Sequence, residues 1–334
     1  MLTYDETLVS PLIPPAPSPH AATDAPTANR REVAGPADLG INNLSLALAG
    51  VQLATAALLA VLYAGSNLTI VWSTALPKVM SLGGIGAAWL YLFLIPGRNR
   101  REWVIAESFA VLLLVMNLSL IAGTGQYLVL LWQRPLIDPY LATADSLLGV
   151  SVPALVVWTG QHDWVAIALR LAYFTLLPQF IVAIVGLGVV LRDRERLWEF
   201  AFHFQLCGLV TMLASGLFPA ECAFTFYGFE SLIDQQRFIH HFEGLRAMTF
   251  QTIRFDDIEG LISFPSFHVA GALMVTWGFR DHRAWFWPLV VLNIGLVAAT
   301  FMTGAHYFVD VLATFVMFSA SVWAYRYLAR MART

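Results

Sequence analysis

The sequence has 334 residues, of which 58% are hydrophobic and only 12% are charged, against about 25% charged residues in an ordinary soluble domain. With a mean hydropathy of +0.67, this composition excludes a water-soluble globular protein and predicts a polytopic membrane protein. The net charge of −3 favours neither an anionic nor a cationic partner. Cys207 and Cys222 are too few for a disulfide framework or a four-cysteine zinc site, so we expect no metal and no cofactor.

The first 40 residues are rich in Pro and Ala and carry Arg30 and Arg31 only near their end. They lack the basic start and the apolar core of a secretory signal. Such a composition cannot bury enough apolar surface to fold. We therefore expect residues 1–40 to form a disordered cytoplasmic tail.

Apolar runs of about 20 residues, each long enough to cross a hydrocarbon core of about 30 Å, predict an all-α membrane bundle of about eight transmembrane helices. The segment from Pro135 to Trp164 is apolar but is interrupted by prolines, glycines and Asp145, so we interpret it as an interfacial or re-entrant piece. The eight predicted spans are 44–66, 74–95, 104–130, 166–191, 199–218, 264–280, 284–304 and 307–329.

The arginines predict the orientation of these spans, because positive charge concentrates on the cytoplasmic side of a membrane. With the N-terminus inside, thirteen of the eighteen arginines fall on the inner side. An odd error in the number of spans would scatter these clusters over both faces. We therefore expect both termini in the cytoplasm, in a plasma (inner) membrane. The inner arginines are Arg30, Arg31, Arg98, Arg100, Arg101, Arg192, Arg194, Arg196, Arg280, Arg283, Arg326, Arg330 and Arg333.

Two short motifs begin the sixth and the eighth predicted spans from the outer side. Phe264–His268 reads Phe-Pro-Ser-Phe-His, and Thr303–Asp310 reads Thr-Gly-Ala-His-Tyr-Phe-Val-Asp. An i,i+4 step puts His306 and Asp310 on one helix face, where the carboxylate can hold the imidazole in one tautomer and raise its basicity. Ionisable groups at membrane depth are costly and tend to be functional, so we predict that His268, His306 and Asp310 form a catalytic site on the outer face.

Structural explanations compete with this hypothesis. A single histidine in an apolar helix is more often a packing residue, which is our interpretation of His203 and His282. For Asp310, the competing explanation is a negative charge that favours the N-terminus of a helix through the helix dipole.

These motifs resemble those of a known family, the type 2 phosphatidic acid phosphatase superfamily. Pro265–His268 is similar to its Pro-Ser-Gly-His motif, and His306–Asp310 is similar to its His-x-x-x-Asp motif. Phe-Pro-Ser-x-His together with His-Tyr-x-x-Asp most resembles the branch that contains fungal inositol phosphorylceramide synthase and related bacterial proteins. The resemblance covers about Asp138 to Tyr327 and implies a six-helix phosphatase-like core. We accordingly expect a tail at 1–40, two additional N-terminal transmembrane helices at 41–103 and a catalytic membrane domain at 104–334.

The sequence departs from the superfamily at two motifs. Thr300 stands where the common third motif has an Arg six residues before the histidine. The Lys-x6-Arg-Pro first motif is missing, because Lys78 is the only lysine and lies far upstream. A bound phosphate still needs cations, and the outer side offers Arg246 and Arg170 as candidates. Loop salt bridges are the ordinary alternative for both arginines.

The resemblance implies a double displacement on a lipid phosphate. His306 attacks phosphorus to give a phosphohistidine while Asp310 holds its other nitrogen, and His268 protonates the leaving alcohol and then deprotonates the acceptor. Ser266 donates a hydrogen bond to a phosphoryl oxygen, and the helix N-termini near both histidines help to stabilise the charge. The implied activity is that of a lipid phosphotransferase or phosphatase acting on phospholipid headgroups at the outer leaflet. The acceptor is water or a hydroxyl group such as that of ceramide or diacylglycerol, and we expect no nucleic-acid partner.

Two hypotheses of other classes remain open. A lipid transporter or flippase could line its pathway with these polar residues, although we find no internal repeat and the polar cluster lies at one edge rather than at the midplane. A catalytically silent membrane scaffold could keep the fold, and Thr300 is the strongest argument for it. Turnover of lipid headgroups by the protein in detergent is expected of an enzyme but not of a transporter or a silent scaffold.

Overall fold

The computed structural model describes residues 43–94, 100–229, 231–233 and 235–331. These residues belong to one compact unit and are mostly helical, with two short strands. The predicted tail at 1–40 lies outside the described residues.

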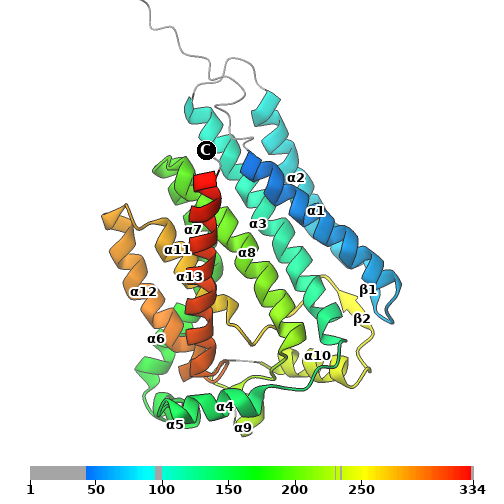
Figure 1. The fold of residues 1–334 in the computed structure, drawn as a ribbon, viewed down its shortest axis with the longest axis vertical. Coiled ribbons are helices and arrows are strands. Elements are labelled where there is room, and N and C mark those ends of the chain that lie inside the picture. Colours follow the sequence, from blue (N-terminus) through cyan, green and yellow to red (C-terminus); the bar gives the residue numbers. More distant parts are fainter. Residues whose placement is uncertain (1–42, 95–99, 230, 234, 332–334) are drawn as a thin grey trace, which may run out of the picture. The chain divides into compact units, whose positions relative to one another are not determined.

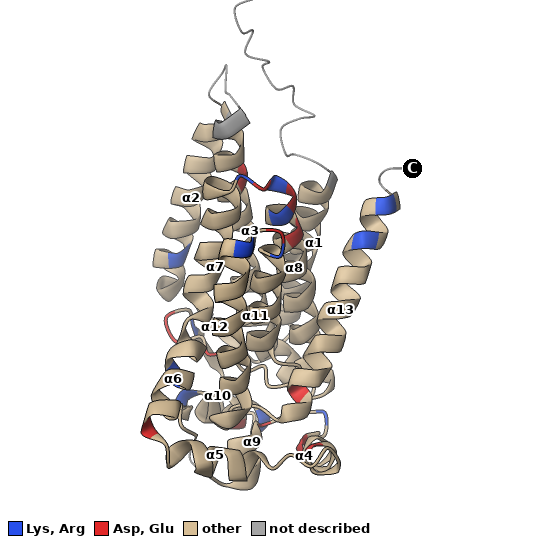
Figure 2. Ribbon diagram, turned by 90° about the vertical axis from the view of Figure 1, so that its left-hand side faces the viewer, with Lys and Arg blue, Asp and Glu red and all other residues tan. Residues whose placement is uncertain are grey.

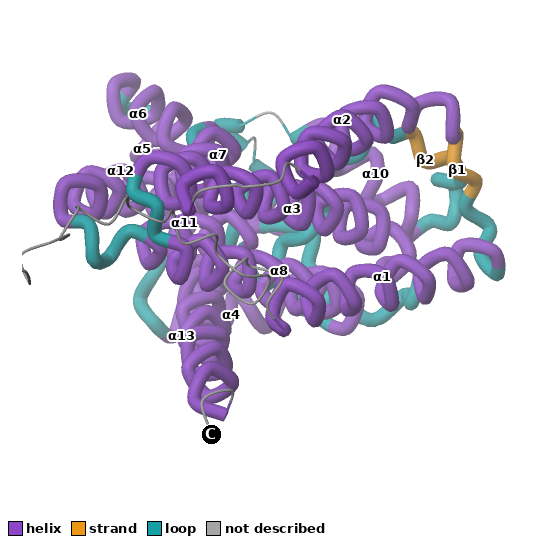
Figure 3. Tube along the Cα trace, turned by 90° about the horizontal axis from the view of Figure 1, so that it is seen from above, coloured by secondary structure: helices purple, strands orange, loops and turns teal. Residues whose placement is uncertain are grey.

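Helices of very different length make up the fold, with two short strands at one edge (Figures 1 and 3). The elements in chain order are α1 (Asn43–Ala64), β1 (Thr69–Val71), the 3-10 helix η2 (Trp72–Ala75), α2 (Leu76–Leu94), α3 (Arg100–Leu130), α4 (Asp138–Leu147), α5 (Val152–Gly160), α6 (Asp163–Phe174), α7 (Leu176–Ile184), the π-helix η3 (Val185–Val190), α8 (Arg194–Leu217), α9 (Ala223–Tyr227), α10 (Gln236–Arg246), β2 (Thr252–Arg254), α11 (Phe267–Gly278), α12 (Arg283–Met302) and α13 (Phe308–Met331).

The described residues include five helices that are long and apolar enough to cross a membrane, or up to seven spans if each of two bent helix pairs counts as one. The five correspond to the predicted spans in α1, α3, α8, α12 and α13. The predicted span 166–191 is a bent pair, because the chain turns by 42° between α6 and α7. The other two predicted spans contain α2 and α11, which are not among these helices, and α11 has only 12 residues. The all-α polytopic bundle is therefore confirmed, while the number of eight spans stays a prediction.

The segment that we predicted to be interfacial or re-entrant folds as α4 and α5, which are bent by 81° at Leu148–Ser151. Ser151 caps α5 by accepting a hydrogen bond from the Ala154 backbone amide, and Gly149 takes a positive φ of 74° in the break. Figure 1 shows α4 and α5 lying across one end of the long helices, close to α9. This end carries the candidate site.

The core of the bundle is built where α3 and α8 pack along each other and α11 packs on α7, α8 and α13. Large side chains such as Leu118, Phe200 and Phe279 are fully buried there. In water, burying a side chain of this size stabilises the folded state by about 1.5–3 kcal/mol. In the bilayer, the helices are instead held together by close packing.

The first two helices are joined to the rest of the chain by buried polar contacts. Gln52 on α1 donates to Gln205 on α8 (2.9 Å), and Asn117 on α3 donates to Gln52 (2.8 Å). Strand β1 pairs in parallel with β2, so that Ile70 lies opposite Ile253. The N-terminal helices thus pack on the remainder of the bundle, and the boundary at 103/104 stays a prediction.

Candidate active site

His306 lies in the turn that leads into α13, and its two ring nitrogens have different partners. Nδ1 is 2.8 Å from the Ser263 carbonyl oxygen and 3.3 Å from Asp310 Oδ2. Because a carbonyl oxygen can only accept a hydrogen bond, Nδ1 carries the proton. Nε2 therefore keeps its lone pair, which is the state required of a nucleophile.

The contact between His306 and Asp310 does not come from helical spacing, since α13 begins only at Phe308. Asp310 Oδ2 instead accepts a hydrogen bond from the Tyr307 backbone amide (2.9 Å), which turns the carboxylate towards the imidazole. Asp310 is fully buried, and its Oδ1 has no hydrogen-bond partner among the described residues. The predicted pair therefore exists, held by a capping turn rather than by a helix face.

Ser266 connects the two motifs. Its hydroxyl lies 3.1 Å from His306 Nε2 and also accepts from the Val269 amide, so that it caps α11. Its backbone amide donates to Thr314 Oγ1 on α13 (3.0 Å). Through these contacts the start of α11 is fixed against the start of α13. The predicted hydrogen bond from the Ser266 hydroxyl to a phosphoryl oxygen stays a prediction.

His268 lies two residues beyond Ser266, in the first turn of α11. Its ring stacks on Tyr173 of α6 with centroids 4.2 Å apart, and the Tyr173 hydroxyl lies 3.4 Å from His268 Nδ1. The ring centroids of His268 and His306 are 6.4 Å apart. This separation is too large for a direct hydrogen bond between the two rings.

Two carboxylates of α4 hold the start of α13, a role that the sequence did not reveal. Asp145 accepts from the backbone amides of Phe308 (3.0 Å) and Val309 (2.8 Å), and Asp138 accepts from the Tyr307 hydroxyl (2.8 Å). Both carboxylates are buried. The three residues that directly follow His306 are thus bound by carboxylates distant in sequence.

The turn before His306 depends on a glycine. Gly304 has a φ of 92°, and a Cβ at this position would lie 2.5 Å from a ring carbon of Phe229. Its carbonyl accepts from the Phe224 amide of α9 (3.1 Å). A larger residue at 304 would therefore displace the turn that presents His306.

The N-terminus of α13 has no free amides for a phosphate in its first turn, because Asp310 and Asp145 occupy those of Tyr307, Phe308 and Val309. The N-terminus of α11 is different, since it opens beside the Ser266 hydroxyl and His306 Nε2. Of the two predicted helix N-termini, only that of α11 is positioned to stabilise negative charge at the site.

No arginine or lysine forms a hydrogen bond or ion pair with His268, His306 or Asp310 within the described part of the chain. Thr300 is buried, and its hydroxyl donates to the Val297 carbonyl of its own helix. It therefore does not replace the missing arginine.

The two predicted phosphate-binding arginines lie near the site but are not joined to it. Arg246 donates to the Arg134 carbonyl (3.0 Å). Burial raises the pKa of Glu221, its neighbours Asp138 and Glu243 raise it further, and Arg246 opposes this shift, so this guanidinium faces an acidic group. Arg170 is exposed on α6, one turn before Tyr173, and has no ion pair with the described residues.

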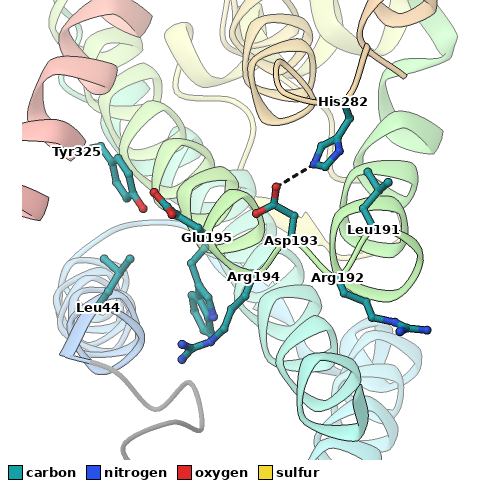
Figure 4. A pocket seen from close by; sticks show the side chains of 9 residues that line it. Leu44, Leu191, Arg192, Asp193, Arg194, Glu195, His282 and Tyr325 are labelled. Carbon is teal, nitrogen blue, oxygen red and sulfur yellow. Dashed lines mark hydrogen bonds and ion pairs between the residues drawn. The ribbon is translucent and has the colours of Figure 1, made fainter. Parts of the chain in front are cut away.

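A second polar region lies at the other end of the long helices. Glu199 on α8 is buried and pairs with Arg196 (2.6 Å) and Arg280 (2.8 Å). A pocket of about 620 Å³ opens beside it around the turn from η3 to α8, where Asp193 pairs with His282 at 2.8 Å (Figure 4). His203 contacts Ser321 Oγ at 2.7 Å. Glu199 and His203 are thus buried and bound within the chain, whereas the Asp193–His282 pair lines the pocket.

Among the described residues, no cluster of three or more His, Cys, Asp or Glu side chains is arranged to hold a metal ion.

Comparison with known proteins gives one match. The family model described as the PAP2 superfamily matches residues 139–324, which is more than half of the chain. The match begins in α4 and ends in α13, so it includes Asp145, His268, His306 and Asp310. No curated protein and no solved structure matches the chain.

Proposed function

Because this chain belongs to the PAP2 superfamily, whose members are typically phosphatases or phosphotransferases, we propose that it transfers phosphoryl groups of a lipid through a phosphohistidine at His306. The observation that carries this proposal is the arrangement of the imidazole, with Nδ1–H held by the Ser263 carbonyl and Asp310 and with Nε2 contacting only the Ser266 hydroxyl among the described residues. A base oriented by a third group is characteristic of an activated nucleophile.

In the first half-reaction, His306 Nε2 attacks phosphorus and forms the N–P bond, while the P–O bond to the leaving alcohol breaks. The negative charge of the phosphate favours the imidazolium form of His268, which then gives its proton to the leaving oxygen. The Asp310 carboxylate and the Ser263 carbonyl stabilise the positive charge that develops on His306. The Tyr173 ring holds His268 in place from the other side.

In the second half-reaction, neutral His268 takes the proton of the acceptor hydroxyl as its oxygen attacks the phosphohistidine, which releases His306. Water as acceptor gives a phosphatase, and a lipid hydroxyl gives a synthase. The Phe264–His268 and His306–Asp310 motifs resemble those of inositol phosphorylceramide synthases, which favours a lipid hydroxyl such as that of ceramide or diacylglycerol.

The phosphate site that we propose consists of the Ser266 hydroxyl and the first backbone amides of α11, with Arg170 and Arg246 closing on the headgroup when it binds. Arg170 supports this role by its place one turn from Tyr173, which contacts His268. Bidentate binding of phosphate by guanidinium is strong enough to draw in an exposed side chain.

We further propose that the site faces the outer leaflet. His268 and His306 lie at the starts of α11 and α13. Arginines cluster at the opposite ends of these helices, in the α11–α12 turn and at the end of α13, and also in the turn between η3 and α8. The positive-inside rule then places the site on the non-cytoplasmic face. Membrane-impermeant thiol labelling of Thr249→Cys but not of Asp281→Cys in intact cells supports this orientation, and the reverse pattern contradicts it.

The test of the function is a product analysis with purified full-length protein in detergent. Phospholipids of different headgroups are supplied with and without ceramide or diacylglycerol, and the products are identified by mass. The wild type is expected to release or transfer one headgroup class, and His306→Ala should lower the rate by at least about 10⁴-fold, the size typical of a lost nucleophile.

The matched control is His240→Ala, since His240 is an exposed histidine of α10 whose ring contacts, among the described residues, are with His241 and Phe250. This variant should keep the wild-type rate. Turnover that persists in His306→Ala removes the proposed mechanism, and a wild type with no turnover on any lipid favours the silent scaffold.

A further inference from the structure

A groove of about 620 Å³ lies between α11, α12 and α13, on a face that the catalytic groups do not use. Side chains from all three helices line it, and most of them are aromatic or aliphatic. The α13 side chains recur every three or four residues, so they form one continuous face of that helix. The lining residues are Leu273, Thr276, Trp277, Phe286, Phe315, Phe318, Ser319, Val322, Trp323, Arg326, Tyr327 and Arg330.

The lining of the groove changes from apolar at one end to basic at the other. Its apolar part is formed around Leu273, Phe315 and Phe318, and the guanidinium groups of Arg326 and Arg330 stand at its other end. No acidic residue lines it. Figure 2 shows the basic turns near the C-terminal end of α13, where this helix diverges from its neighbours.

The two arginines are not committed to other charged groups. Both are exposed, and neither has an ion pair with the described residues. The Arg326 guanidinium lies 5.5 Å from the centre of the Trp277 ring. Trp277 in turn donates its indole N–H to the buried Glu199 (3.0 Å), which fixes the wall of the groove. The positive charge at the open end is therefore available to a ligand.

The length of α13 places the arginine end of this groove in the leaflet opposite the catalytic site. With a rise of about 1.5 Å per residue, Asp310 and Arg330 lie about 30 Å apart along the helix, close to the thickness of a hydrocarbon core. Phe315 and Arg326 are separated by about 16 Å, or about one leaflet. Trp323 and Tyr327 stack at 5.5 Å near the arginines, at the depth where interfacial aromatic residues concentrate.

We propose that this groove binds one anionic glycerophospholipid of the inner leaflet. An acyl chain lies against the aromatic and aliphatic wall, and the phosphate accepts hydrogen bonds from Arg326 and Arg330. The charge complementarity selects an anionic lipid over a zwitterionic one, because the groove has two guanidinium groups and no carboxylate to bind an ammonium group.

This lipid is not the substrate in another pose. Its phosphate would lie on the far side of the bilayer from His306, well beyond reach of Nε2. It contacts α11 and α13, the helices that follow Ser266 and His306, so its position also braces these two helices against each other. The proposal does not depend on the phosphotransfer mechanism.

The experiment is native mass spectrometry of the full-length protein in detergent, titrated with phosphatidylglycerol or with phosphatidylcholine of the same acyl chains. The wild type is expected to retain one phosphatidylglycerol in preference to phosphatidylcholine. Arg326→Gln with Arg330→Gln should weaken phosphatidylglycerol retention by roughly 30-fold, as expected from two basic residues at an anionic lipid. Inorganic phosphate alone should not compete, because it lacks the acyl chain.

Two further variants keep the test decisive. Arg192→Gln removes an exposed arginine of the α7–α8 turn that does not line the groove, and it should keep the wild-type retention. Ser319→Phe fills the groove from an exposed position and should lower retention although both arginines remain. Equal retention of the two lipids by the wild type, or unchanged phosphatidylglycerol retention in the double variant, would overturn the proposal.

Discussion

The two ends of this bundle both bury acidic residues but satisfy them in different ways. At one end Glu199 is held by the guanidinium groups of Arg196 and Arg280. At the other end Asp310 is held by a backbone amide and an imidazole, and Asp145 is held by backbone amides alone. The first end is neutralised within the chain, whereas the second contains no cation in contact with its carboxylates among the described residues.

This difference suits the Glu199 cluster to a structural role and the Asp310 cluster to the catalytic role that we propose. A carboxylate paired with two arginines leaves no group free to react. At the other end, the same kind of carboxylate fixes a histidine whose second nitrogen faces only a hydroxyl. Our proposal places the substrate phosphate beside this nitrogen, where amide donors and cations would stabilise its charge.

The largest effect on stability is expected at the end of the bundle where Glu199 pairs with two arginines. Glu199→Ala leaves Arg196 and Arg280 without their shared partner, and breaking a buried ion pair in this way costs about 3–5 kcal/mol. Thermal unfolding in detergent should show this loss, while headgroup turnover per folded molecule stays close to wild type. Glu195→Ala, at an exposed position one turn earlier, is the control. An unchanged melting temperature for Glu199→Ala would contradict the structural role.

A smaller loss of stability, joined to a loss of activity, is expected at the other end. Asp145→Ala removes the acceptor for two amides at the start of α13, which costs about 1–2 kcal/mol as for other helix caps. Since these amides closely follow His306, turnover should also fall. The expected change is a lower kcat with an unchanged KM. Asp163→Ala changes an exposed acidic residue in the first turn of α6 and should alter neither. Normal turnover in Asp145→Ala would show that this contact does not position His306.

The smallest expected effect is a pH dependence of stability, which arises from His241 at the end of the bundle that carries the candidate site. His241 on α10 accepts from the Tyr127 hydroxyl at Nδ1 (2.8 Å) and lies 3.3 Å from Asp257. Burial lowers the pKa of His241, although Asp257 opposes this shift. The unfolded chain, with a histidine pKa of about 6.5, then binds the proton more readily than the folded one. Stability is complete above about pH 6.5 and falls as the pH drops below it.

A melting-temperature series from neutral to mildly acidic pH tests this expectation. His241→Gln should flatten the decline. His240→Gln should flatten it only slightly, because the neighbouring His240 lowers the pKa of His241 less than burial does. A decline of equal slope in His241→Gln would assign the pH dependence to other groups.

Much of the fold could be predicted from the sequence, because long apolar runs in a bilayer must form helices whatever they pack against. The site histidines were also predictable, since Ser266, His268, His306 and Asp310 lie in two short motifs at the starts of helices. The bend between α6 and α7 was not predicted, because the apolar run continues through Thr175 and Leu176 without a charged residue.

The contacts that position His306 could not be read from the sequence. Asp138 and Asp145 lie more than 160 residues before α13 along the chain, and the Ser263 carbonyl is a backbone group that any residue would supply. The roles of Arg170 and Arg246 stay predictions, since the sequence gives their predicted side of the membrane but not their distance from a phosphate.

The most direct test of the central claim is to trap the phosphoryl group on the protein. An aryl phosphodiester labelled at phosphorus, whose phenolate leaves without protonation, is given to purified wild type and to His268→Ala, and the labelled peptide is identified under alkaline conditions that preserve phosphohistidine. The mechanism predicts label on His306, with more in His268→Ala because the acceptor is no longer deprotonated. Turnover of this substrate with no label on His306, or label that persists in His306→Ala, would contradict it.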